Sequence, residues 1–179
     1  MRRIFIILLL IMTTFFLWSP LTASQNKAKH PFFLERSKNR NIVQYDVRLT
    51  GNGDLLDPNP VTAYWILQDG RREELNPVEK ELAYGIVSQE KMAKNKFKIY
   101  LAAFKNREII VEKIGGPFRA VVFIHGKESI LQKVYVESKE GSIGQPDVLY
   151  LDLLGRTIRT NLPVRERICL AKNGQNGQC

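Results

Sequence analysis

The chain has 179 residues, a formal net charge of +9 and hydrophobic residues at 44% of its positions. This length fits one domain with a substantial core, and the scattered Lys and Arg residues are a poor fit to a nucleic-acid-binding protein. The charge instead favours an anionic partner, such as a lipid head group, a wall polymer or an acidic ligand, or serves solubility alone.

Residues 1–24 have the layout of a secretory signal peptide. Two arginines give a positive start, an apolar run covers 4–18, and small residues precede position 25. Ser19 and Pro20 break the apolar run before the roughly 20 residues that a spanning helix needs, which favours cleavage over an uncleaved membrane anchor. Cleavage would remove two arginines and no acid, lowering the charge of +9 by two to +7. We therefore expect an exported protein, periplasmic or secreted, with a single β-rich domain over 25–168.

Residues 32–47 are expected to form a β-hairpin, because apolar and polar residues alternate on both sides of the polar stretch ERSKNRN. The connection runs from Ser37 to Arg40, where Asn39 tolerates the positive φ of a tight turn. The residues expected to face the interior are Phe32, Leu34, Arg36, Val43, Tyr45 and Val47.

The segment over 50–60 is rich in Gly, Asn, Asp and Pro and predicts a loop before a strand over 61–67. Part of this loop, from Gly51 to Asp57, is similar to a calcium-binding loop. The full series of acidic ligands is missing, so we expect a turn and no metal site.

The segment NPVEKELAYG predicts the one convincing helix. Asn76 suits the cap position, a proline occupies the first turn, and Glu79 lies three residues after the cap, as in a capping box. Gly85 fits the terminating position. The helix is expected to be a short lid or strap with Val78 and Leu82 facing inward.

After a charged link over 88–95, further strands are expected, with a turn at Asn106 and Arg107 after the strand KFKIYLAAF. Roughly nine short strands and no alternation of strands with helices predict an all-β fold. Long antiparallel strands and the need to remove exposed edges favour a barrel-like, calycin-type layout, with a β-sandwich as the alternative.

The two cysteines, Cys169 and Cys179, lie near the end of the chain in a Gly- and Asn-rich tail that is expected to be flexible over 169–179. In an oxidising compartment they can pair, although a free or intermolecular thiol is nearly as favoured. The sequence has no CxxC and no Cys/His cluster, which disfavours a zinc site.

The standard catalytic constellations are mostly missing from the sequence. Neither His30 nor His125 accompanies a G-x-S-x-G elbow, and no P-loop is present. We therefore expect no cofactor. Paired carboxylates remain the basis of a hydrolase hypothesis. Their candidates are Glu35, Asp46, Glu79 and Asp152.

The stretch ERSKNRN is explained only in part by a turn. Arg36 is expected on the inward face, where a charge needs a partner, and that partner is Glu79, Asp152 or an anionic ligand. Aromatic residues on many strands would line a ligand pocket if they converge, although an ordinary core explains them as well. The residues predicted to bind a ligand are Glu35, Arg36, Lys38, Asn39, Asn41, Tyr45, Trp65 and Glu79.

Five stretches carry a resemblance to a known family: FFLERSKNRNIVQYD, NPVTAYWI, EELNPVEKELAYG, IHGKESILQKVYVESKE and VLYLDLLGRTI. From Phe32 to about Arg167, the chain resembles the bacterial family of uncharacterised exported proteins called domain of unknown function 4833. The resemblance implies a single-domain exported protein. It implies no catalytic or ligand-binding residue.

These observations favour a non-catalytic binding module of the cell envelope or secreted space, for an anionic or amphipathic ligand. One alternative is a carboxylate-dependent hydrolase acting on an envelope polymer. The other is a structural protein that docks on an envelope assembly. Membrane contact is expected only through an uncleaved signal anchor or at the protein surface.

Overall fold

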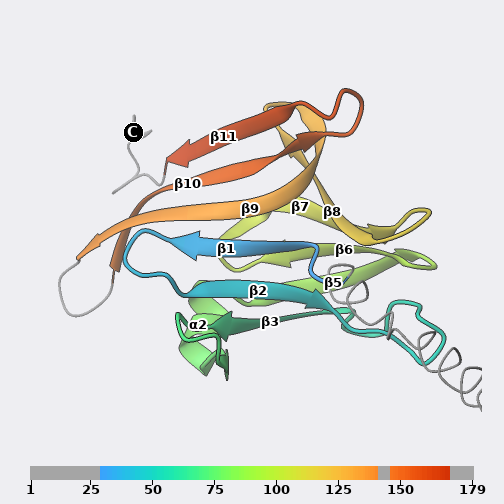
Figure 1. Cartoon of the computed structure of the whole chain (residues 1–179), viewed down its shortest axis with the longest axis horizontal. Coiled ribbons are helices and arrows are strands. Elements are labelled where there is room, and N and C mark those ends of the chain that lie inside the picture. Colours follow the sequence, from blue (N-terminus) through green and yellow to red (C-terminus); the bar gives the residue numbers. More distant parts are fainter. Residues whose placement is uncertain (1–28, 141–145, 170–179) are drawn as a thin grey trace, which may run out of the picture.

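The computed structural model describes residues 29–140 and 146–169, so the predicted signal peptide and Cys179 lie outside the described residues. Eleven strands form one strongly curled sheet, a half-barrel, with one short helix beside it (Figure 1). The strands are β1 (Phe32–Arg36), β2 (Ile42–Val47), β3 (Val61–Ile66), β4 (Arg72–Glu74), β5 (Ile86–Ala93), β6 (Lys96–Leu101), β7 (Phe104–Lys113), β8 (Phe118–Ile124), β9 (Lys127–Glu140), β10 (Pro146–Thr157) and β11 (Pro163–Cys169), and the helix is α2 (Pro77–Leu82). The prediction of an all-β, barrel-like fold with one short helix is confirmed. Within the described ranges, no helix is long and apolar enough to cross a membrane.

The long strand β9 is the branch point of the sheet. One edge of β9 pairs with β10, while its other edge pairs with β8 near its start and with β1 further on. Two branches therefore curl away from β9, one through β1, β2, β3 and β4 and the other through β8, β7, β6 and β5 (Figure 1). The β1–β9 pair is parallel, which departs from the expected antiparallel layout.

A bulge in β9 changes which residues face the core. Leu131 pairs with Gly155 and Lys133 with Leu154, so Gln132 is an extra residue on β9. Leu131 and Val134 are consequently both fully buried although their sequence spacing is odd. A Cβ atom at Gly155 would collide with the Ile130 carbonyl, so this crossing requires glycine.

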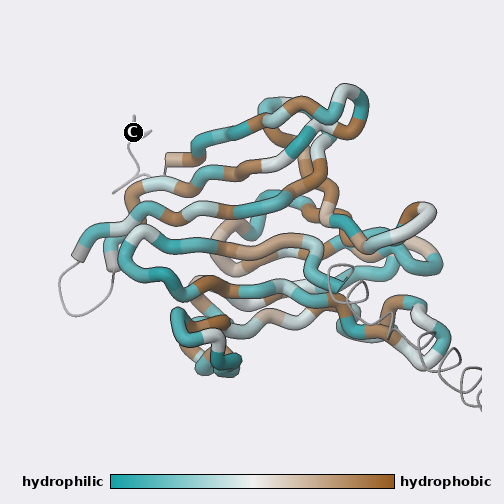
Figure 2. The backbone as a smooth tube through the Cα atoms, viewed as in Figure 1, coloured by the Kyte–Doolittle hydropathy of each residue, from teal (hydrophilic) through white to brown (hydrophobic). Residues whose placement is uncertain are grey.

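The interior of the half-barrel is apolar, and hydrophobic and hydrophilic residues alternate along the strands (Figure 2). The predicted inward faces of β1 and β2 are confirmed: Phe32, Leu34, Val43 and Tyr45 are at most 1% exposed. The rings of Phe32 and Tyr45 stack with their centroids 4.3 Å apart. Burial raises the pKa of Tyr45 far above its ordinary value, so this phenol stays neutral.

A side chain joins the two branches of the sheet where β3 approaches β5. The Gln89 amide accepts a hydrogen bond from the Val61 backbone N–H at 2.9 Å and donates one to the Val61 carbonyl at 3.1 Å. Gln89 thus satisfies both backbone groups of Val61, as a neighbouring strand would.

The structure corrects three local predictions. The charged link expected over 88–95 belongs mostly to β5, whose exposed residues hide the usual apolar alternation. The turn expected at Asn106 and Arg107 comes earlier, at Ala102 and Ala103, because β7 already begins at Phe104. Asn39 does not have a positive φ; its side chain instead accepts a hydrogen bond from the Asn41 backbone N–H at 3.1 Å.

The predicted capping box of α2 is present. The Asn76 side chain accepts from the Glu79 backbone N–H, and the Glu79 carboxylate accepts from the Asn76 backbone N–H, both at 2.9 Å. Val78 and Leu82 were expected to face inward, but nothing in the described part of the chain covers them: they are 62% and 65% exposed. Gly85 is needed for a different reason than a left-handed cap: a Cβ atom there would collide with the Lys80 carbonyl.

Candidate functional site

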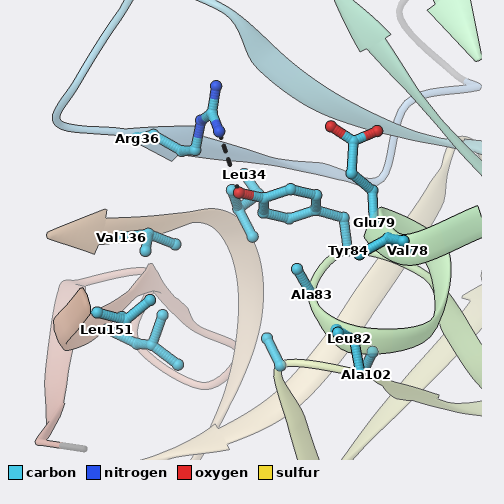
Figure 3. Close-up of a pocket in the computed structure, with 12 residues that line it drawn as sticks. Leu34, Arg36, Val78, Glu79, Leu82, Ala83, Tyr84, Ala102, Val136 and Leu151 are labelled. Carbon is cyan, nitrogen blue, oxygen red and sulfur yellow. Dashed lines mark hydrogen bonds between the residues drawn. The ribbon is translucent and has the colours of Figure 1, made fainter. Parts of the chain in front are cut away.

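A cavity of about 410 Å³ opens between α2 and the inner face of the half-barrel (Figure 3). Its walls come from β1, α2, the turn between β6 and β7, β9 and β10, and most of them are apolar. The apolar wall residues include Leu34, Ala83, Ala102, Val136, Val148 and Leu151. The exposed side chains of Val78 and Leu82 also border this space. The cavity therefore has the make-up of a small-molecule site, which is mostly apolar with few polar groups.

Arg36 is the cation of this cavity. It lies at the end of β1 on the same face as Phe32 and Leu34, as its position in the strand predicted. Its guanidinium carbon lies 4.5 Å from the centre of the Trp65 ring and 5.8 Å from that of Tyr84. Its Nη1 atom donates a hydrogen bond to the Tyr84 hydroxyl at 3.2 Å (Figure 3). Two aromatic rings thus hold the guanidinium by cation–π contact.

The guanidinium of Arg36 is not fully satisfied by these contacts. Its Nε atom is buried and has no hydrogen-bond partner among the described residues. Neither predicted partner, Glu79 or Asp152, forms an ion pair with it. Because a buried donor without a partner is costly, the guanidinium of Arg36 keeps hydrogen-bonding capacity that its protein neighbours do not use.

The aromatic residues that contact Arg36 are themselves held in place by further contacts. The Glu79 carboxylate accepts a hydrogen bond from the Trp65 indole N–H at 3.2 Å, which ties the start of α2 to β3. The Trp65 and Tyr84 rings meet edge to face, with centroids 5.0 Å apart. The Tyr45 hydroxyl donates to the Tyr84 carbonyl at 2.8 Å. The geometry around Arg36 is therefore built by residues far apart in the sequence.

Two of the eight residues predicted to bind a ligand, Arg36 and Glu79, line the cavity, and two more, Trp65 and Tyr45, contact the lining residues Arg36 and Tyr84. The other four lie outside the cavity. Glu35 accepts from the Lys133 ammonium at 3.0 Å, Lys38 and Asn39 are exposed in the turn, and the Asn41 side chain accepts from the Gln68 backbone N–H at 2.9 Å. Tyr84 was not among the eight, although it is one of the aromatic residues that the sequence offered as pocket-lining candidates, and it does line the cavity.

The remaining candidate acids have structural partners. Asp152 is 2% exposed and forms ion pairs with Arg165 at 2.5 Å and Arg167 at 2.9 Å. Hydrogen bonds from Arg167 and then Arg165 outweigh burial and hold the pKa of Asp152 below its ordinary value. Asp46 contacts His30 and the Tyr64 hydroxyl. Both carboxylates are therefore engaged by neighbouring side chains, which favours a structural role over a catalytic acid–base pair.

The predicted turn over 51–57 is tied to the β5–β6 hairpin. The Asp54 carboxylate accepts from the Asn95 side chain at 2.7 Å and pairs with Lys94 at 3.1 Å, and Asp57 pairs with Lys91 at 2.7 Å. The carboxylates of Asp54 and Asp57 are therefore already paired with lysine side chains. Over the described residues, no three His, Cys, Asp or Glu side chains gather as a metal site would require. The possible pairing of Cys169 involves Cys179, which lies outside the described residues.

The comparisons with known proteins agree with the resemblance found in the sequence. No curated protein and no solved structure matches the chain. A family model described as a domain of unknown function, DUF4833, matches residues 32–167. The matched segment runs from the first residue of β1 into β11 and contains every residue that lines the cavity. The chain therefore belongs to the DUF4833 family.

Proposed function

We propose that the protein is a binding module for an amphipathic anion, which it holds in the cavity between α2 and the half-barrel. The negatively charged head of the ligand binds Arg36, and the apolar part lies along the cavity walls. The observation that carries the proposal is the guanidinium of Arg36, which lines an apolar cavity and has no acidic partner and an unsatisfied Nε donor among the described residues.

The charge of Arg36 supports an anionic head. Burying a cation without an acidic partner is unfavourable, and the rings of Trp65 and Tyr84 compensate only in part. A carboxylate or phosphate would accept hydrogen bonds from two guanidinium nitrogens at once. Such a ligand would use guanidinium donors other than the one that binds Tyr84, so the existing bond from Nη1 to the Tyr84 hydroxyl would stay intact.

The walls of the cavity support an apolar body. Val78 and Leu82 on α2 are largely exposed, and they border the same space as the buried Leu34 and Leu151. Apolar surface gains free energy when it leaves water, at about 25 cal/mol per Å². A ligand that fills the cavity would cover the two exposed side chains of the helix.

The N-terminal segment of the sequence supports a location in the cell envelope or outside the cell. The apolar run over 4–18 supports export, so the ligand would be met in the cell envelope or outside the cell. The basic charge of the chain would also attract anions to its surface.

The test compares matched ligands on the purified protein by isothermal titration calorimetry. Decanoate and decyl phosphate are expected to bind better than uncharged decanol, and the two anions distinguish a carboxylate from a phosphate head. Arg36→Gln is expected to weaken anion binding about ten- to a hundredfold, because it removes the charge-assisted hydrogen bonds. Arg48→Gln, which removes the same charge at an exposed site outside the cavity, is the matched control and should bind as the wild type does. Equal binding by Arg36→Gln and the wild type, or no binding of either anion, would overturn the proposal.

A further inference from the structure

The cavity at Arg36 has a neighbour on the far side of the turn between β6 and β7. This second cavity has a volume of about 680 Å³. Three residues line both spaces: Ala102 and Ala103 of the turn, and Leu151 of β10. These two small side chains and one leucine therefore form the boundary between the two cavities, and we call this boundary the saddle.

We propose that the ligand is a single-chain amphiphile whose apolar chain runs from the Arg36 cavity across Ala102 and Ala103 into the second cavity. This inference rests on the proposed function and adds the shape and the minimum length of the ligand. A bulky or branched apolar body would fill the first cavity alone, whereas a linear chain can pass a narrow saddle and remain in contact with both walls.

The position of the saddle is fixed by the backbone. The Ala102 N–H donates a hydrogen bond to the Gly85 carbonyl at 2.9 Å, and this bond holds the turn against the backbone between α2 and β5. Ala102 is only 8% exposed, and neither alanine carries atoms beyond Cβ. A larger residue at this turn would extend into the space that the two cavities share.

The two cavities differ in a way that orients the chain. The second cavity has apolar walls from Phe104, Phe123 and Ile168, with Lys105 and Asn106 exposed at its rim. Arg107, the other cation that lines it, already has an acidic partner: it pairs with Glu166 at 2.6 Å and donates to the Phe123 carbonyl at 2.6 Å. Arg36 has no such acidic partner among the described residues. The head therefore binds at Arg36 and the chain end lies in the second cavity, where it covers the exposed ring of Phe123.

The experiment measures affinity against chain length, with linear alkanoates from hexanoate to tetradecanoate kept below their micelle concentrations. Each methylene that enters an apolar cavity is expected to raise affinity about fourfold. For the wild type the rise should continue into the longer ligands. Ala103→Leu narrows the saddle, so its gain in affinity per methylene should match that of the wild type for short chains and should end at a shorter chain length. Ala93→Leu adds the same side chain at an exposed position of β5 outside both cavities and should follow the wild type.

A second variant does not depend on the fold tolerating a larger residue at the turn. Phe123→Ala removes a ring that is 58% exposed, and it should weaken binding of long chains while leaving short chains unchanged. The inference is overturned if the wild type and both variants reach their plateau at the same chain length, or if Ala103→Leu weakens all lengths equally. In either case a continued dependence on Arg36 would leave the proposed function standing, whereas loss of that dependence would remove both.

Discussion

Replacing Arg36 by methionine should leave the free energy of unfolding nearly unchanged, although the residue lines the interior of the sheet. The substitution removes a buried Nε donor that lacks a partner, which relieves about 1–3 kcal/mol. It also removes the hydrogen bond to Tyr84, worth about 1 kcal/mol, and the contact with the Trp65 ring, worth about 1 kcal/mol. These effects nearly cancel, so we expect a change below about 1 kcal/mol.

Urea denaturation of the ligand-free protein, followed by tryptophan fluorescence, measures this change. Arg119→Met is the matched comparison, because Arg119 does have a buried acidic partner: it donates to Glu112 at 2.7 and 3.0 Å. That variant should lose about 1–3 kcal/mol, since Glu112 would keep only Lys96. A loss of about 3–5 kcal/mol in Arg36→Met, as expected for breaking a buried ion pair, would refute the reasoning by showing that Arg36 has an acidic partner in the folded protein.

Two further predictions concern the fold and its response to pH. Gln89→Ala should lower the free energy of unfolding, measured in urea, by about 2 kcal/mol, because both backbone groups of Val61 lose their partner. Gln68→Ala, at an exposed site, is the control. Equal stability of the two variants would contradict the role of Gln89. Asp152→Asn should be less stable than the wild type at pH 7, because Arg167 and Arg165 lower the pKa of Asp152 from its ordinary value of 3.8. A carboxylate whose pKa is lower in the folded protein stabilises the fold above the pKa of the unfolded chain, and this stabilisation is lost as the pH falls through the folded pKa. The difference in the free energy of unfolding between the wild type and Asp152→Asn should therefore shrink below about pH 4 in denaturation curves. A difference that stays constant with pH would refute this role of Asp152.

Local patterns in the sequence were sufficient to predict the part of the fold that presents Arg36. Alternation in β1 and β2 places Arg36 on the side of Phe32 and Leu34, because successive side chains of a strand point to opposite faces. The capping box of α2 was also predictable, since it depends on Asn76 and Glu79 alone. Both features are set by residues a few positions apart.

Contacts between distant segments could not be predicted in the same way. The parallel β1–β9 pair and the link from Gln89 to Val61 join residues whose spacing carries no local signal. The bulge at Gln132 reverses the alternation of β9, so that a regular period assigns its second half to the wrong face. The partner of Arg36 was missed because aromatic rings hold it, whereas the sequence suggested the nearest acids.

The exposure of Val78 and Leu82 shows the limit of sequence patterns for the site itself. Their spacing on a two-turn helix tells which side of α2 is apolar, but it does not tell what covers that side. In the structure the apolar side of α2 faces the cavity and stays open. The pattern was therefore correct about the direction of these side chains and wrong about their burial.

Three unusual features meet in this one cavity: the Nε atom of Arg36 without a partner among the described residues, the exposed apolar side of α2, and apolar walls around an open space. A purely anionic ligand would satisfy the arginine and leave Val78 and Leu82 in water. A purely apolar ligand would cover the helix and bury the arginine further, at a greater cost. Only a ligand that combines both properties accounts for all three features at once, which is why the amphipathic anion is favoured over either simpler class.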